Sequence, residues 1–364
     1  MARVWQAIRG SPLLWLLVFV PAVLLAEHLG PRSGTLLFVL SVLAIVPLAA
    51  LLSQATEAVA ARTGDTVGGL LNATLGNLTE LVIALTALAA GQMMLVKASI
   101  AGAIVTNTLF MLGASFLLGG LKHHTQEFNA GSARLQAAQL FLATIALMVP
   151  STVASGSRAA DGAFATQLSL ALAVLMMLVY LLGLLFTLKT HKEFFQAAAH
   201  HDAAEGEPWP LPAALVVLAA VTVLVALVSE VFVASVEEAA RTMGMTDAFV
   251  GFIVVALVGG AAEMASAFSG ARRNRLDLSV GIALGSATQI ALFVAPVLVV
   301  ASYFVAPAPM TLEFWPGAVA MMLFATLTAM MICNGGRSAW FTGALVLAVY
   351  LTFAIALYLL PPQG

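Results

Sequence analysis

The sequence predicts an all-α polytopic membrane protein with about eleven transmembrane helices, arranged as a first helix followed by two inverted five-helix repeats. The 364 residues are 62% hydrophobic and only 9% charged, with a mean hydropathy of +1.03, whereas charged residues make up roughly a quarter of a soluble domain. Apolar runs recur near the roughly 20-residue length that a helix needs to cross the hydrocarbon layer, without the alternating strands of an outer-membrane barrel. One motif also occurs twice.

Each expected helix is an apolar run between charged or Pro/Gly-rich breaks, because a segment in lipid must satisfy its own backbone polar groups. The first run follows basic residues but has no clean small-residue cleavage site after it, which indicates a retained helix rather than a signal peptide. The expected spans are 12–29, 35–60, 67–91, 98–119, 136–154, 164–187, 211–236, 247–270, 279–303, 314–333 and 339–360.

The basic residues indicate how these spans are oriented. Eleven of the fifteen Lys and Arg residues fall on the side that holds the N-terminus, and four fall on the other side. Because cytoplasmic loops are enriched in Lys and Arg, the N-terminus is expected in the cytoplasm and, after an odd number of spans, the C-terminus outside. This pattern predicts a multi-pass protein of the plasma membrane, in a bacterium the inner membrane.

The least hydrophobic connection, residues 189–210, divides the chain near its middle and is expected to be a cytoplasmic linker. It leaves an N-terminal helix within 1–33, a first five-helix repeat within 34–188 and a second within 211–364. Because five is odd, the second group enters the membrane in the opposite orientation, which is the condition for an inverted-topology repeat.

Two glutamates hold matching positions in these repeats. Glu80 lies in GNLTELVIALTAL (76–88) and Glu263 in GGAAEMASAFSGA (259–271), each four residues after a glycine. Opposite orientation of the two spans brings both carboxylates to the membrane midplane. An ionised carboxylate in hydrocarbon costs at least several kcal/mol, and neither span contains a Lys or Arg to neutralise it. The pair therefore predicts a bound cation or proton.

The polar residues near the pair predict the kind of cation. All of them offer oxygen ligands, which suit hard ions such as Ca²⁺, whereas zinc or copper favours imidazole or thiolate. The glycine-rich stretches 68–77 and 258–262 predict a bend or break in each span. The candidate ligands besides the glutamates are Asn77, Thr79, Asn107, Ser286, Thr288 and Gln289.

The same carboxylates can hold protons or a divalent ion but resist holding both. Burial favours the neutral carboxyl form, whereas a bound cation favours the charged form. This mutual exclusion is the minimum that an antiporter requires. The empty, fully ionised site is then the costly state, which favours a carrier that crosses between its two faces only when loaded.

Long motifs support this interpretation. They are GGLLNATLGNLTELVIALTALAAGQ followed by VKASIAGAIVTNTLFMLGASFLLGG, and VGGAAEMASAFSGARRNRLDLSVGIALGSATQIALFVAPV. From about Leu51 to Ala301 the chain resembles the cation/proton exchanger (CAX) family of the Ca²⁺:cation antiporter superfamily. The resemblance implies a secondary antiporter that exports Ca²⁺ in exchange for H⁺ by alternating access. It also implies that Glu80 and Glu263 are the central ion and proton ligands, assisted by Asn77, Asn107 and Gln289.

The resemblance further implies that the second and seventh spans slide or tilt to open one side or the other. Polar residues in these spans are expected to line the access paths: Ser53, Gln54, Glu57, Glu230 and Ser235. Glu57 and Glu230 are expected to be additional proton carriers. One departure matters, because Gly260 and Met264 stand where the family has asparagine and histidine, and a lost imidazole removes a group that titrates near neutral pH.

Other functions stay open at this point. On the same fold, Na⁺ could drive transport, or Mn²⁺, Na⁺ or K⁺ could be the cargo. A channel or an intramembrane metal-dependent hydrolase belongs to a different class, but the chain has no HExxH pair and no GxSxG elbow. No cofactor is expected besides the transported ions. Membrane lipid is an expected partner, a homo-oligomer is possible in principle, and the net charge of −2 indicates no nucleic acid.

Overall fold

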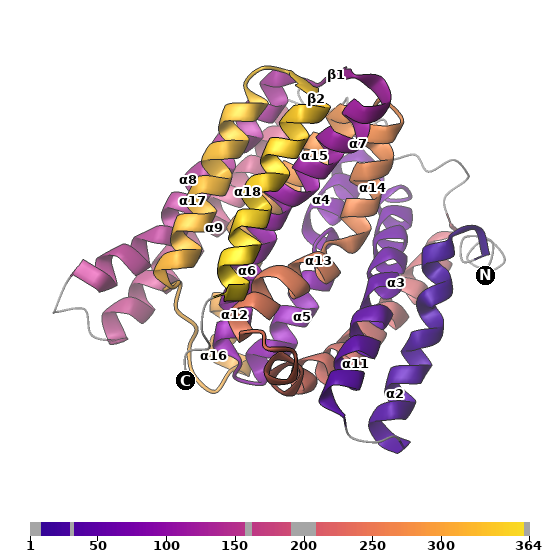
Figure 1. The fold of residues 1–364 in the computed structure, drawn as a ribbon, viewed down its shortest axis with the longest axis vertical. Helices are drawn as coiled ribbons and strands as arrows, with labels where there is room; N and C mark the ends of the chain where they lie inside the picture. The colour runs from indigo at the N-terminus through magenta and orange to yellow at the C-terminus, as the bar shows by residue number, and fades with distance from the viewer. Residues whose placement is uncertain (1–8, 30–32, 157–161, 191–208, 360–364) are drawn as a thin grey trace.

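The computed structural model describes residues 9–29, 33–156, 162–190 and 209–359, and helices dominate these ranges (Figure 1). Within them, nine helices are long and apolar enough to cross a membrane, or up to eleven if each of two bent helix pairs counts as one span. The predicted fold class is therefore confirmed. Most of the predicted linker, residues 191–208, lies outside the described residues.

The helices follow the predicted order. The first span consists of a 3₁₀ segment, η1 (Pro12–Val18), and α2 (Phe19–Leu29). The first repeat then runs through α3 (Gly34–Ala60), α4 (Asp65–Leu75), α5 (Leu78–Ala89), α6 (Met93–Val105), η2 (Thr106–Met111), α7 (Leu112–His123), α8 (Ala130–Gly156), α9 (Gly162–Leu185) and η3 (Phe186–Thr190).

The second repeat has the same succession of long, broken and π-interrupted helices. It runs through α11 (Leu211–Met243), α12 (Asp247–Phe249), η5 (Val250–Val255), α13 (Ala256–Gly259), α14 (Ala261–Arg272), α15 (Leu276–Gln289), η6 (Ile290–Val294), α16 (Ala295–Val305), α17 (Pro316–Cys333) and α18 (Trp340–Leu359). α11 continues seven residues beyond the predicted end of its span at 236.

Each repeat contains one broken span, as the glycine-rich stretches predict. The helix pair that ends in α5 bends by 43° next to Gly76, and the pair that ends in α14 bends by 60° next to Gly260. Glycine is a poor helix former and leaves room for close packing. Both breaks therefore lie directly before the helices that carry Glu80 and Glu263.

One feature departs from the all-α prediction. Thr125–Glu127 (β1) and Arg337–Ala339 (β2) form a two-stranded antiparallel sheet at one end of the bundle (Figure 1). A 2.7 Å ion pair between Glu127 and Arg337 closes it. Three-residue strands are too short for periodicity to reveal, and this pairing joins the loops of two different repeats.

The loops sort into the two sides that the basic residues predict. On the N-terminal side, Lys122 Nζ donates to the Arg272 carbonyl and Arg62 Nε donates to the Trp209 carbonyl. On the other side, the Gly34 amide donates to Glu238. Lys97 Nζ donates to the Thr311 hydroxyl on that side, and the Phe314 amide donates to the Ser151 hydroxyl. Each contact joins segments that the odd and even spans place on one face.

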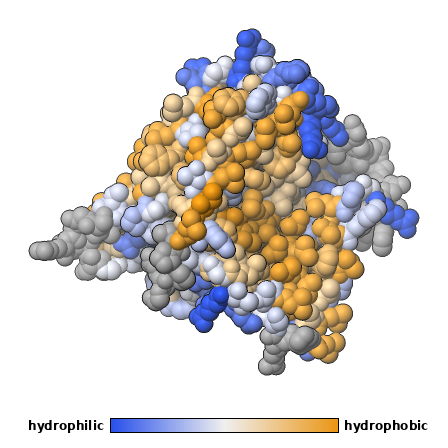
Figure 2. Space-filling model, viewed as in Figure 1, coloured by the Kyte–Doolittle hydropathy of each residue, from blue (hydrophilic) through white to orange (hydrophobic). Residues whose placement is uncertain are grey.

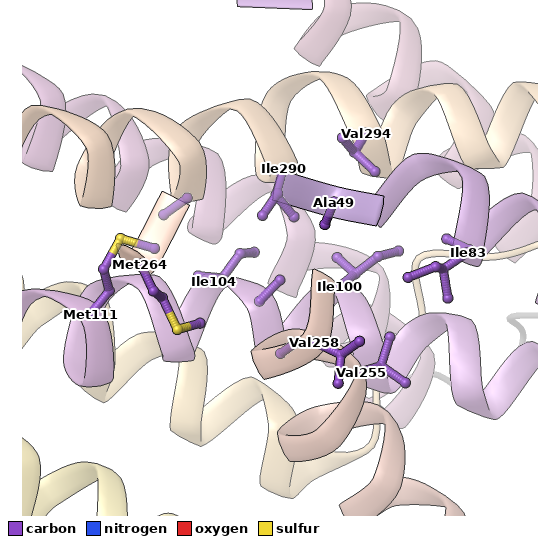
Figure 3. Close-up of a cluster of buried hydrophobic side chains, with 14 of the residues drawn as sticks. Ala49, Ile83, Ile100, Ile104, Met111, Val255, Val258, Met264, Ile290 and Val294 are labelled. Carbon is purple, nitrogen blue, oxygen red and sulfur yellow. The ribbon is translucent and has the colours of Figure 1, made fainter. Parts of the chain in front are cut away.

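The surface matches a protein that sits in lipid. Figure 2 shows a broad apolar belt below a polar end that carries β1 and β2, with further polar patches near the opposite end. Inside, apolar side chains from both repeats pack together around the breaks (Figure 3); they include Ile83, Ile104, Val258, Met264 and Ile290. The broken helices therefore lie within a packed core.

Candidate functional site

Both glutamates occupy the third position of a helix that starts at a break. Glu80 lies in the first turn of α5, and Glu263 lies in the first turn of α14. The first turn of a helix has amide groups without intrahelical partners and a partial positive charge, so it favours a carboxylate. The two breaks thus place two acids at two helix N-termini inside the bundle.

The two carboxylates approach each other through a glycine. Glu80 packs on Gly259, where an added Cβ would lie 2.9 Å from Glu80 Cγ and 3.5 Å from Glu80 Oε1. Glu263 follows Gly259 by four residues and experiences the charge of Glu80 directly. Any larger residue at 259 would push the two acids apart.

An uninterrupted chain of hydrogen bonds runs across the two repeats beside this pair. Asn107 Nδ2 donates to Ser286 Oγ at 2.8 Å, and Ser286 Oγ donates to Asn77 Oδ1 at 2.7 Å. Asn77 Nδ2 in turn donates to Gln289 Oε1 at 2.6 Å. Ser286 also hydrogen-bonds Glu263. The structure therefore brings together six of the predicted ligand residues, all with oxygen atoms.

One oxygen in this cluster lacks a partner. Glu263 Oε2 is among the few buried side-chain atoms with no hydrogen bond within the described part of the chain. A buried carboxylate oxygen without a partner costs free energy that a proton or a cation would recover. The donor set fits a hard cation, because it consists of two carboxylates, three amides and a hydroxyl.

The remaining candidates lie elsewhere. Thr79 is buried, and the Thr288 hydroxyl donates to the Leu284 carbonyl of its own helix. Gln54 is half-buried in α3. In the same helix the Ser53 hydroxyl donates to Glu57 Oε1 at 3.1 Å, three residues before the helix ends.

The two candidates on α11 differ in exposure. Ser235 is buried and donates to the Phe232 carbonyl. Glu230 is exposed, 13 residues before the end of the helix. At a rise of about 1.5 Å per residue, this places it roughly 20 Å from that end.

Gly260 and Met264 form one packing unit. A Cβ on Gly260 would lie 3.2 Å from Met264 Cε and 3.2 Å from the Ala256 carbonyl oxygen, with Asn107 Oδ1 at 3.6 Å. In the other repeat, Asn77 occupies the corresponding place after the glycine. The site is therefore asymmetric, with an amide at the first break and a thioether beside the second.

This packing predicts that the two positions are coupled. Gly260→Asn is expected to lower the melting temperature of the purified protein, because overpacking a filled site costs about 1–3 kcal/mol. Met264→Ala added to Gly260→Asn is expected to recover part of that loss. Melting curves of the wild type, both single variants and the double variant give a double-mutant cycle. Purely additive effects would show that the two side chains do not compete for one space.

Sequence patterns alone did not single out the aromatic residues around the site. Phe110 lies in η2 and Phe293 in η6, and they are separated by the same 183 residues that separate Glu80 from Glu263. That repeat offset is the signal that could have identified them. Tyr180 and Tyr350 pack on these rings but do not share the offset, because the connections before the last helix of each repeat differ in length.

Comparison with known proteins agrees with the two-repeat architecture. The family described as sodium/calcium exchanger protein matches residues 33–189 and again 213–359. A Ca²⁺/H⁺ antiporter of Aphanothece halophytica is 39% identical over 359 residues, covering 95% of this chain and 96% of the relative. The Ca²⁺/H⁺ antiporter ChaA of Bacillus subtilis is 40% identical over 330 residues, covering 90% and 93%.

Solved structures show the same fold. The structure of native YfkE superposes with a TM-score of 0.83 at 36% identity, covering 96% of this chain and 100% of that one. An H⁺/Ca²⁺ exchanger CAX structure has a TM-score of 0.69 at 18% identity, covering 96% and 88%. The match along both repeats and the shared fold place this chain in the sodium/calcium exchanger protein family, as a multi-pass secondary transporter rather than an enzyme.

Proposed function

We propose that this protein exports Ca²⁺ from the cytoplasm in exchange for H⁺. The single observation that supports this most is the buried Glu263 Oε2, which has no hydrogen-bond partner within the described residues although it lies beside Glu80 and an all-oxygen network. The relatives named above are Ca²⁺/H⁺ antiporters, and the donor chemistry suits the same pair of ions.

In this proposal the two glutamates bind either Ca²⁺ or protons. Metal ligands must be deprotonated, so metal binding releases protons and its affinity falls as the pH falls. Asn77, Asn107, Ser286 and Gln289 supply neutral oxygens that replace part of the hydration shell of the ion. Their hydrogen bonds to one another hold these oxygens in place before the ion arrives.

The access paths complete the proposal. α3 and α11 pack along each other and contact the broken helices of both repeats. Tilting of these two long helices would expose the glutamate pair to one side at a time. Ser53, Gln54 and Glu57 would line one path, and Glu230 and Ser235 the other. In this role Glu57 and Glu230 would pass protons on.

The proposed location is the plasma membrane, with the N-terminus in the cytoplasm, the C-terminus outside and lipid around the apolar belt. Arg272, Arg273 and Arg275 would then lie on the cytoplasmic face, where basic residues favour anionic lipid. Association into a homo-oligomer is part of the proposal only as an open possibility, which cross-linking in native membranes would resolve.

Transport of Ca²⁺ into inverted membrane vesicles tests this function. An acid interior is expected to drive Ca²⁺ uptake, and a protonophore is expected to abolish it, because the proton gradient supplies the free energy. Uptake that ignores the protonophore but follows an imposed Na⁺ gradient would replace H⁺ by Na⁺ as the driving ion. Uptake of Mn²⁺, Na⁺ or K⁺ in place of Ca²⁺ would change the cargo.

A further inference from the structure

A backbone carbonyl at the first helix break is held by a side chain from a distant helix. In α4 the amide of Gly76 donates to the Asn72 carbonyl at 2.8 Å, which is the last regular bond before the bend. The next carbonyl, that of Ala73, would pair with the amide of Asn77 in an unbroken helix. It accepts the Tyr180 hydroxyl at 2.7 Å. A buried carbonyl that loses its helical donor must find another partner.

Tyr180 also touches the opposite side of the ion site. It is a buried residue of α9, and its ring stacks on Phe293 with centroids 5.2 Å apart and planes at 27°. Phe293 lies in η6, four residues after Gln289. One side chain thus contacts both the segment before Asn77 and the π segment after Gln289, and these two amides hydrogen-bond each other.

The second repeat has a similar ring contact but a different polar contact. Tyr350 of α18 packs on Phe110 of η2 with centroids 5.2 Å apart and planes at 43°. Its hydroxyl lies 3.4 Å from the Thr106 hydroxyl and not on a carbonyl at the second break. The polar contact of Tyr180 is therefore specific to the break that carries Asn77 and Glu80.

We infer that Tyr180 is a positioning residue for cation binding. Its hydroxyl holds the Ala73 carbonyl, and through it the end of α4, while its ring holds η6. Together these two contacts set the separation at which Asn77 meets Gln289. The consequence for the cation follows from the proposed exchange function, whereas the contacts themselves are independent of which ion is carried.

Tyr180→Phe is the informative variant, because it keeps the ring on Phe293 and removes only the hydroxyl. In proteoliposomes, the KM for Ca²⁺ is expected to rise about tenfold, the factor that corresponds to about 1.4 kcal/mol, with the maximal rate changed less than about twofold. Tyr350→Phe is the matched control, and its KM is expected to stay within about twofold of the wild type. Equal effects of both variants, or a change in the maximal rate alone, would overturn the inference.

A second measurement does not depend on the ion. Thermal melting of Tyr180→Phe, Asn77→Ala and the double variant forms a cycle in which non-additive effects are expected, because the hydroxyl acts through the Asn77 segment. The same cycle with Asn107→Ala is expected to be additive, since Asn107 bonds Ser286 and lies in a different helix. A wild type that moves no Ca²⁺ sinks the proposed function alone, whereas additivity in the Asn77 cycle sinks the role of Tyr180.

Discussion

Glu80→Gln and Glu263→Gln are each expected to reduce proton-driven Ca²⁺ transport by about 100-fold or more, since even outer partners of a metal site cost 10–100-fold when they are replaced. Glutamine keeps the volume of the side chain but cannot take up a proton or carry the negative charge. The measurement is Ca²⁺ uptake into vesicles at matched protein levels. Full activity in either variant would contradict the site assignment.

The folded state is expected to survive these two changes. Glu263 has a buried oxygen without a partner, and a neutral amide removes a buried charge, so the melting temperature of Glu263→Gln is expected to stay at or above that of the wild type. Glu237→Gln is the matched control. Glu237 is exposed and lies 3.9 Å from Arg241, a contact that contributes little in water. Its transport rate is expected to stay unchanged.

Gly102→Ala is expected to prevent stable folding or to cost about 3 kcal/mol, the upper end for overpacking a filled core. Gly102 is buried where α6 crosses η5 of the other repeat. An added Cβ would lie 2.1 Å from the Phe252 carbonyl oxygen and 2.4 Å from its Cα, so the backbone itself would have to move. The yield of monodisperse protein in detergent and its melting temperature measure the effect.

Gly285→Ala is the control that the repeat provides. Gly285 holds the same 183-residue offset from Gly102, but the nearest atom to an added Cβ is Gln136 Oε1 at 3.9 Å, an ordinary contact. Alanine in a helix interior is about 0.5–1 kcal/mol more favourable than glycine, so this variant is expected to melt at or above the wild-type temperature. Equal melting temperatures for the two variants would show that the crossing at Gly102 adapts.

The membrane spans follow from local composition, and the structure agrees with them closely. A predicted span at 279–303 corresponds to α15, η6 and α16 over Leu276–Val305, and one at 339–360 corresponds to α18 over Trp340–Leu359. The agreement is close because every backbone group in lipid needs a partner within its own segment. β1 and β2 were not predicted, since their partners lie more than 200 residues apart.

The candidate site divides in the same way. The repeat offset identifies Glu80 and Glu263, and the structure places Asn77, Asn107, Ser286 and Gln289 in one hydrogen-bonded chain. Their roles as ligands stay a prediction, as do the roles of Glu57 and Glu230. Nothing in the sequence indicates the competition between Gly260 and Met264 for one space.

By itself the sequence determined the class of protein, the number and limits of the spans, the two breaks and the paired acids, because these depend on hydrophobicity, glycine content and a repeat that can be counted along the chain. Only the tertiary structure decided that Tyr180 caps the Ala73 carbonyl, that Gly102 meets the Phe252 backbone and that Glu80 packs on Gly259. Each of these contacts joins residues more than 100 positions apart, and its existence depends on how helices of opposite orientation cross in the packed bundle.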